Sequence, residues 1–430
     1  MTDSAAAQTP TMAPIVMPED RLPWPATIVA GAQHVIAMFG ATVLGPLLMG
    51  FDPNVCVLFS GIGTLIFYFA VGGKVPSFLG SSFSFIAAVT AATAYAGSGP
   101  NPNVATALGG VIACGALYAV IGAIVIATGA GWLEKVMPPV VTGAVVAAIG
   151  LNLARVAVGQ VSADPTATGF GLLTIVLVAV AAVALPGFLS RIPILIGGGI
   201  AYLIYLGVAN GAGAAPPIDF TDISSAAWFG LPSFTAPVFD PRAIALIAPV
   251  AIVLVAENLG HVRAIGAMIG RNLDPYLGRA FIGDGIATMV SGAGGGVGVT
   301  TYAENMGVMS LTRNFSSATF LVAGGIAILL GLSPKFGALI HTIPGPVIGG
   351  LSFVVFGLIA ATAGRIWVDA KVDFSLPKNL LVVGVALVMG AGDLTVSIGD
   401  FPFGGIAMTT FSALGLYHLL SLFQRFRPAA

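Results

Sequence analysis

The chain has 430 residues, of which 57% are hydrophobic and only 8% are charged, and its formal net charge at pH 7 is −1. Because a soluble globular domain carries about 25% charged residues, this composition excludes a soluble protein, and the balanced charge gives no support for a nucleic-acid partner. Apolar runs of about 20 residues recur along the chain, which is the pattern of an all-α polytopic membrane protein.

The predicted elements begin after a short tail. Residues 1–22 have neither the basic start nor the apolar core of a signal peptide. Fourteen apolar segments follow, at roughly 25–50, 54–71, 84–98, 105–129, 137–158, 168–187, 192–210, 243–262, 280–297, 303–312, 316–332, 342–363, 379–396 and 402–424. The longest polar connection, 211–242, separates seven segments in 23–210 from seven in 243–424, and 425–430 forms a C-terminal tail.

Two of these segments are too short to span a membrane as helices. The third, 84–98, follows GGKVPSFLGSS, and the tenth, 303–312, follows SGAGGGVGVTTY. Glycine, proline and β-branched residues favour extended backbone leading into a half helix. Short, interrupted segments at matching places in two halves are the best sequence indication of a transporter's binding site.

The basic residues predict the topology. With both termini in the cytoplasm, thirteen basic residues lie inside, namely Arg21, Lys74, Lys135, Arg191, Arg263, Arg271, Arg279, Arg313, Arg365, Lys371, Lys378, Arg425 and Arg427. Three lie outside: Arg155, Arg242 and Lys335. This asymmetry follows the positive-inside rule.

The stretch AIVLVAENLGHV at residues 251–262 places an acid inside an apolar run. A charge at the bilayer centre costs about 3 kcal/mol on insertion scales, so Glu257 is a functional candidate. Burial favours the protonated form of a carboxyl group, and His261 lies one turn further on the same helix face. The alternative is a pair that only holds helices together.

Glu304, in TTYAENMGVMSLTR, falls at the start of the second half helix, where free backbone N–H groups can meet a ligand carbonyl. Its alternative role is a helix-capping acid. Phe83, at the matching break in LGSSFSFIAA, could stack on a flat ring, although a core-facing side chain is the commoner role. His34 could bond to a site residue or be structural, and Arg155 and Asp284 are expected near segment ends with structural roles.

Other kinds of site find little support. Cys56 and Cys114 stand alone in apolar stretches, so neither a disulfide framework nor a metal site is expected. An integral-membrane enzyme would need a metal cluster or a nucleophile with its base, and Glu257 with His261 lacks further partners. No cofactor is expected.

Four motifs resemble the nucleobase–ascorbate transporter family, the second nucleobase:cation symporter family, and within it the bacterial uracil and pyrimidine permeases. The family motif is an acid or amide, then N-x-G, four variable residues and T-[R/K], and residues 304–313 read ENMGVMSLTR. QHVIAMFGATVL (33–44), PSFLGSSFSF (76–85) and AENLGHV (256–262) are also similar to the family. The likeness covers roughly residues 20–425.

The resemblance implies fourteen transmembrane segments in two inverted repeats of seven, arranged as a core domain with the two broken helices and a gate domain that forms a homodimer. It also implies that Glu257 and Glu304 hydrogen-bond a pyrimidine, that His261 lies beside them for proton coupling, and that Phe83 packs on the ring. The expected substrate-binding set is completed by Ala41, Ser82, Tyr302 and Ala303, with His34, Thr301 and Asn305 in supporting roles.

The resulting prediction is a proton-coupled uracil importer in the inner membrane of a bacterium, working by alternating access on a small-molecule nucleobase, with the proton as the coupling ion. A purine permease for xanthine or urate is the nearest alternative, but purine members of the family usually carry glutamine in place of Glu304. An anion exchanger on the same fold would need a cation near the half-helix ends, and the sequence offers none there.

Overall fold

The computed structural model describes residues 15–95, 99–398 and 401–425, and these are helical apart from two short antiparallel strand pairs. The elements of the first half are α1 (Trp24–Met49), α2 (Pro53–Ala70), β1 (Leu79–Ser81), η1 (Phe83–Phe85), α3 (Ile86–Thr93), α4 (Val104–Thr128), α5 (Gly131–Val136), α6 (Pro139–Val161), α7 (Pro165–Ala184), η2 (Gly187–Arg191), α8 (Pro193–Leu206), η3 (Gly207–Gly211) and α9 (Thr221–Ser225). Those of the second half are α10 (Pro241–Ile247), α11 (Val250–Ile269), η4 (Asp274–Tyr276), α12 (Leu277–Ala293), β2 (Val299–Thr301), α13 (Ala303–Thr312), α14 (Ser317–Gly331), α15 (Pro334–His341), α16 (Gly345–Asp369), α17 (Pro377–Gly392), β3 (Val396–Ile398), β4 (Phe401–Phe403) and α18 (Gly405–Arg425).

Every predicted apolar run coincides with a helix, which confirms a helical membrane protein. Within the described residues, nine helices are long and apolar enough to cross a membrane, and a tenth span results if α14 and α15, which meet at 77°, count as one. The count of fourteen spans stays a prediction. The third and tenth predicted segments correspond to η1 with α3 and to α13. Both are short because a strand precedes each of them.

Three helices begin at an aspartate followed by a proline. Asp52, Asp164 and Asp240 each accept hydrogen bonds from backbone N–H groups of the next turn, in α2, α7 and α10. The carboxylate pairs a donor that the helix leaves free, while proline at the first position needs no partner for its nitrogen. These Asp-Pro pairs are therefore readable start signals.

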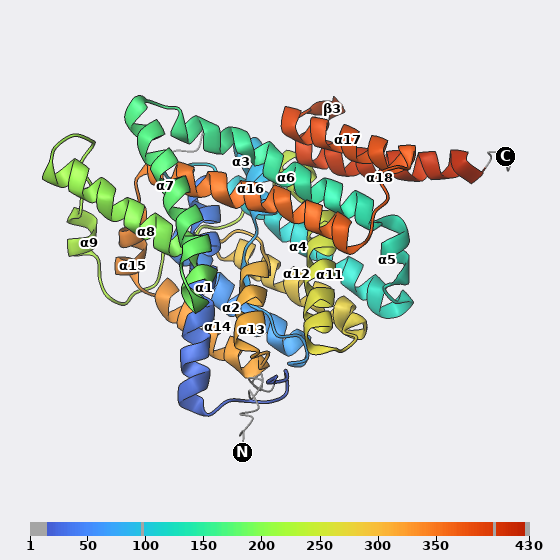
Figure 1. The fold of residues 1–430 in the computed structure, drawn as a ribbon, viewed down its shortest axis with the longest axis horizontal. Helices are drawn as coiled ribbons and strands as arrows, with labels where there is room; N and C mark the ends of the chain where they lie inside the picture. The colour runs from blue at the N-terminus through green and yellow to red at the C-terminus, as the bar shows by residue number, and fades with distance from the viewer. Residues whose placement is uncertain (1–14, 96–98, 399–400, 426–430) are drawn as a thin grey trace, which may run out of the picture.

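Two groups of helices pack mainly among themselves. One contains α1, α2, α4, α12 and α14, and the other contains α6, α7, α16, α17 and α18. In Figure 1, α6, α16, α17 and α18 lie across the upper part of the view, with α1, α2 and α14 below them. α3 and α11 contact both groups, through α4 and α6, and α13 packs on α1 and α11.

Glycine allows a close contact between α4 and α12. Gly115 of α4 and Gly285 of α12 face each other, and a Cβ added to either would lie 2.6 Å from the other's carbonyl oxygen. Small residues let helices in a membrane approach to backbone contact, where dispersion and weak hydrogen bonds replace the hydrophobic effect. The α4–α12 pair therefore forms a rigid centre for the first group.

The beginning of the described chain packs against the ends of three helices. Val16 pairs with the segment after α13, accepting from the Phe315 N–H (2.9 Å) and donating to the Arg313 carbonyl (3.0 Å). Glu19 forms ion pairs with Lys74 after α2 (3.2 Å) and Arg271 after α11 (2.9 Å). The predicted tail 1–22 is thus docked from residue 15 onward, and its first fourteen residues lie outside the described part, as do 426–430 of the C-terminal tail.

Candidate functional site

The two stretches predicted to be extended pair with each other. β1 and β2 are antiparallel, with Leu79 opposite Thr301 and Ser81 opposite Val299. At Gly80 a Cβ would lie 2.4 Å from the Tyr302 ring, so this position requires glycine. The pairing satisfies backbone groups that a non-helical segment would otherwise expose at membrane depth.

A threonine on the preceding helix holds the first residue of each strand. The Thr64 hydroxyl, on α2, accepts from the Leu79 N–H (2.9 Å), and its one proton points between the Ser60 carbonyl (2.8 Å) and the Leu79 carbonyl (3.4 Å). The Thr288 hydroxyl, on α12, accepts from the Val299 N–H (3.2 Å) and donates to the Val299 carbonyl (3.1 Å). Both strands are thereby fixed to the packed helices beside them.

Each strand leads directly into a short helix. Ser82 follows β1, donates its N–H to Gly298 (3.0 Å) and accepts from the Ser84 N–H (3.3 Å) with its hydroxyl. Tyr302 follows β2 and donates its N–H to Phe78 (3.2 Å). Because the strands run in opposite directions, the N-termini of η1 and α13 lie at opposite ends of one small sheet, where their free N–H groups can meet a polar ligand.

Glu257 and His261 lie half-buried on α11, beside this sheet. The Glu257 carboxyl faces the Ser84 hydroxyl and is close enough to Glu304 to interact with its charge. His261 Nδ1 is hydrogen-bonded to Thr301 Oγ1 at 2.9 Å. The structure therefore brings both predicted acids together and connects the histidine to the end of β2.

The beginning of α13 carries three predicted residues with different surroundings. Ala303 is exposed, Glu304 is half-buried and Asn305 is fully buried. Asn305 donates to the His34 carbonyl (3.1 Å) and lies 2.9 Å from His34 Nδ1. His34 thus bonds the neighbour of Glu304 and anchors α13 against α1.

The remaining predicted residues lie around the strand pair. Phe83 is half-buried, and its ring packs edge to face on Phe356 of α16 at 6.3 Å between centroids. Tyr302 is buried and its hydroxyl donates to the Ser81 carbonyl (2.8 Å), so this side chain braces the strand. Ala41 is buried on α1, which packs beside β1 and α13.

One prediction was wrong. Asp284 does not lie near a segment end, because α12 begins at Leu277 and places it in mid-helix, with no exposed surface. Its Oδ2 accepts from Asn258 Nδ2 (2.6 Å) and from the Tyr118 hydroxyl (3.4 Å), linking α11, α4 and α12. The rule that singled out Glu257, an ionisable residue inside an apolar run, would also have found Asp284 had the boundary been placed three residues earlier.

A cavity of about 480 Å³ lies where α3, α10 and α11 face α6 and α18. Its inner end reaches Ser84 and Val253, one turn before Glu257 on α11, and Asn152, Arg155 and Asp393 line it on the other side. Neither predicted acid lines this cavity, but Ser84, which faces Glu257, does.

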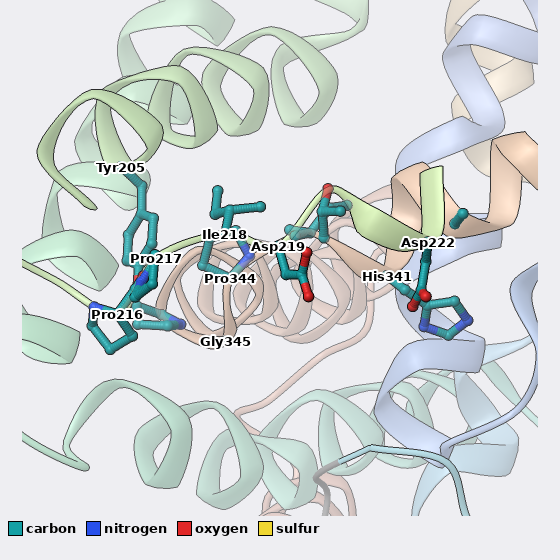
Figure 2. Close-up of a pocket in the computed structure, with 13 residues that line it drawn as sticks. Tyr205, Pro216, Pro217, Ile218, Asp219, Asp222, His341, Pro344 and Gly345 are labelled. Carbon is teal, nitrogen blue, oxygen red and sulfur yellow. The ribbon is translucent and has the colours of Figure 1, made fainter. Parts of the chain in front are cut away.

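A second groove, also of about 480 Å³, lies elsewhere and contains none of the predicted site residues. Figure 2 shows Tyr205 and Pro216 at one end of it and Asp222 with His341 at the other. Among the residues that the structure describes, no three His, Cys, Asp or Glu side chains gather as a metal ion would require.

Comparison with known sequences gives full-length matches. A family model described as the permease family matches residues 25–399. The chain is 56% identical over 413 residues to the "Putative pyrimidine permease RutG" of Escherichia coli (strain K12), covering 96% of this chain and 93% of that protein. It is 38% identical over 424 residues to the uracil permease of Paenibacillus larvae, covering 95% and 96%.

Comparison with solved structures shows the same fold at low identity. The transmembrane domain of the cyanobacterial bicarbonate transporter BicA matches with a TM-score of 0.62 at 16% identity, covering 92% of this chain and 97% of that one. The structure of SLC26A9 matches with a TM-score of 0.66 at 14% identity, covering 93% and 66%. These likenesses confirm a helical transporter fold and carry no information about the substrate.

Proposed function

This chain belongs to the permease family and is a membrane transporter rather than an enzyme, and from that premise we propose that it imports uracil by proton symport across a bacterial cytoplasmic membrane. The proximity of Glu257 on α11 to Glu304 at the start of α13, beside the β1–β2 pair, carries the proposal. The names of the relatives, pyrimidine and uracil permeases, support the choice of substrate.

Uracil presents N–H donors and carbonyl acceptors in alternation around one flat ring. The carboxylates of Glu257 and Glu304 can each accept from a ring N–H. Backbone N–H groups at the starts of η1 and α13, near Phe83 and Ala303, can donate to the carbonyls. Hydrogen bonds of this kind to charged acceptors are worth about 1.5–3 kcal/mol each.

Side-chain exposure supports the proposed contacts of Ala303 and Phe83 with the substrate. Ala303 is exposed at the start of α13, so its backbone is accessible to a ligand. Phe83 is half-buried and presents a ring beside α16, where a planar heterocycle can pack against it. Ser82 and Tyr302 directly follow β1 and β2, so they contact the substrate from the ends of the two strands. Ala41 of α1 limits the size of the pocket.

Proton coupling is assigned to Glu257 together with His261. Protonation neutralises a charge in a low-dielectric site, so a proton and a substrate that both contact Glu257 affect each other's binding. The hydrogen bond between His261 and Thr301 couples the protonation of Glu257 to the end of β2. The electrochemical proton gradient then drives import.

Alternating access is supported by the separation of the helices into two groups, and by a cavity where α3, α10 and α11 face α6 and α18 of the second group. The first group with α11 and α13 acts as the core domain, and the second acts as the gate through which two copies associate. The matched contacts of Thr64 and Thr288 support two inverted repeats of seven segments. Both termini are assigned to the cytoplasm from the distribution of basic residues.

The decisive experiment is uptake of radiolabelled uracil into proteoliposomes, with and without an inward proton gradient. Uptake should rise with the gradient and collapse when a protonophore is added. Xanthine and bicarbonate, tested as competitors, distinguish a purine permease or an anion exchanger. Uracil uptake that ignores the gradient would remove the coupling, and displacement by xanthine alone would remove the pyrimidine assignment.

A further inference from the structure

The segment 226–239 exposes an unusual amount of apolar surface. It contains six large apolar side chains that are each more than half exposed: Trp228 (77%), Phe229 (68%), Leu231 (76%), Phe234 (51%), Val238 (52%) and Phe239 (61%). This segment is called the strap below. Contiguous exposed apolar residues on this scale mark a surface that is covered in the working protein.

The strap is tied to helix ends. The Gly230 N–H donates to the carbonyl of Leu332 (2.9 Å), directly after α14, and the Lys335 N–H donates to Ala227 (3.0 Å). At its other end the Val238 N–H donates to Ala105 (2.8 Å), the second residue of α4. The strap therefore runs at the level where spanning helices begin and end, which is the membrane–water interface.

Two glycines make room for the strap's backbone. A Cβ at Gly109 of α4 would lie 2.3 Å from the Val238 carbonyl oxygen, and one at Gly295 would lie 2.8 Å from the Thr235 nitrogen. The Phe234 ring packs against Phe59, in the second turn of α2, at 6.2 Å between centroids. The strap is thus seated on the flank of the helices, slightly below their ends.

The composition of the strap suits a partly apolar environment. Pro232 and Pro237 carry no backbone N–H, so two donors that an extended segment would leave unpaired are absent. Lipid offers no hydrogen-bond partner to a backbone N–H group, so an unpaired one is costly there. The same cost restricts spanning segments to helices and barrels.

A tryptophan and a cation are stacked at this face. The Lys335 ammonium lies 4.6 Å from the centre of the Trp228 ring. An equivalent pair occurs at the beginning of α1, where the Arg21 guanidinium lies 4.2 Å from the centre of the Trp24 ring, which is also exposed. Tryptophan concentrates at both membrane interfaces, and a cation above the ring can meet a lipid phosphate.

We propose that the strap is an in-plane membrane anchor that binds phospholipids of the outer leaflet, with Trp228, Phe229 and Leu231 among the upper acyl chains and Lys335 on a headgroup phosphate. Its hydrogen bonds to α4 and α14 transmit that attachment to the first helix group. The anchor sets the depth of this group in the bilayer and does not depend on what the protein transports.

The test is fluorescence quenching of a protein in which Trp24, Trp132 and Trp367 are replaced by phenylalanine, leaving Trp228. The protein is reconstituted in vesicles that contain phosphatidylcholine and phosphatidylglycerol brominated either near the glycerol backbone or near the acyl terminus. Shallow bromine should quench Trp228 at least about twofold more strongly than deep bromine, and aqueous iodide should quench weakly, as expected for an interfacial tryptophan. Trp24, left alone in the matched variant, provides the interfacial reference.

Other occupants give different results. Strong iodide quenching without bromolipid quenching means that the strap is in water, and insensitivity to both quenchers means that a second copy or another protein covers it, so either result overturns the anchor. If the triple replacement does not fold, the difference in quenching between the unmodified protein and Trp228→Phe gives the same measurement. Lys335→Ala should weaken the preference of Trp228 quenching for brominated phosphatidylglycerol by about twofold, because the lost ammonium attracts an anionic headgroup more strongly than a zwitterionic one.

Discussion

Asn258 donates a hydrogen bond to Asp284 across α11 and α12, with 2.6 Å between Nδ2 and Oδ2, and neither side chain has exposed surface. Asn258 directly follows Glu257, so consecutive residues of α11 point about 100° apart around the helix. One faces the second acid of the site and the other fixes the helix to its neighbour. The position of Glu257 therefore depends on a contact that no ligand touches.

Asn258→Ala should destabilise the protein by about 2 kcal/mol, because a buried carboxyl loses its closest donor. Asp284→Asn should cost less, since an amide oxygen still accepts from Asn258 and Tyr118. Thermal unfolding of the detergent-purified protein, followed by the loss of the monodisperse chromatographic peak, measures both. Equal melting temperatures for Asn258→Ala and the unmodified protein would show that this bond contributes nothing to stability.

Glu304→Gln should weaken uracil binding by about 10- to 100-fold, because an amide that donates toward a ring N–H replaces a charged acceptor. The same change could admit a purine. Isothermal titration with uracil and xanthine checks both effects. Asp369→Asn, an exposed carboxyl-to-amide change on α16, is the control and should bind uracil normally. Unchanged uracil affinity in Glu304→Gln would remove this residue from the site.

His261→Leu should retain much of the uracil binding and lose most of the pH dependence of uptake. Thr301→Val should change the pH dependence in the same direction but less, because it removes the bond to Nδ1 and leaves the imidazole in place. Uptake measured across a pH series gives both profiles, with His418→Leu on α18 as the control. A normal pH profile in His261→Leu would make the histidine structural.

Thr64→Val and Thr288→Val should destabilise the protein by similar amounts, about 1–2 kcal/mol each, because each leaves one strand N–H and carbonyl without their partner. Uracil affinity should fall in both, since the strands position the two half helices. Thr362→Val, an exposed threonine of α16 that bonds only within its own helix, is the control. Strongly unequal losses would argue against equivalent roles in the two halves.

The docked segment at residues 15–21 should respond to acid. Burial alone raises the pKa of Glu19, but hydrogen bonds from its own backbone, Lys74 and Arg271, together with the charge of Arg271, outweigh burial and lower it. A carboxyl whose folded pKa is lowered contributes stability above its unfolded pKa, and that stability is lost as pH falls through the folded value. The difference in melting temperature between the unmodified protein and Glu19→Gln should therefore be full above the unfolded pKa of about 4.3 and disappear as pH falls through the lower folded value. A difference that persists in acid would exclude the ion pairs as its cause.

Local patterns predicted the helices well, because hydrophobic runs are properties of short stretches. The strand positions were also predictable from glycine, proline and β-branched residues. Their pairing was not, since nothing near Leu79 indicates that Thr301 is its neighbour. Glu257 became a candidate because a carboxyl in an apolar run is rare in a membrane protein, and Glu304 because it begins a half helix.

The residues that the sequence did not reveal are those whose hydrogen-bond partners lie on another element of the fold. Thr64 and Thr288 are two threonines among many, and only the fold places them against the strands. His261 was expected to act through the carboxyl one turn earlier, yet its hydrogen bond goes to Thr301, on another element. The apolar residues of the strap lay in the longest polar connection, where no spanning pattern marked them.

The pairing of β1 with β2 also has a consequence for biosynthesis. A ribosome completes Leu79 long before it reaches Thr301, so the first strand enters the membrane without its partner. Until the second half is inserted, the backbone of β1 must be held by Thr64, by water or by the translocation machinery, because lipid offers it no hydrogen bonds. The strand pair on which the proposed site rests is therefore completed only late in translation.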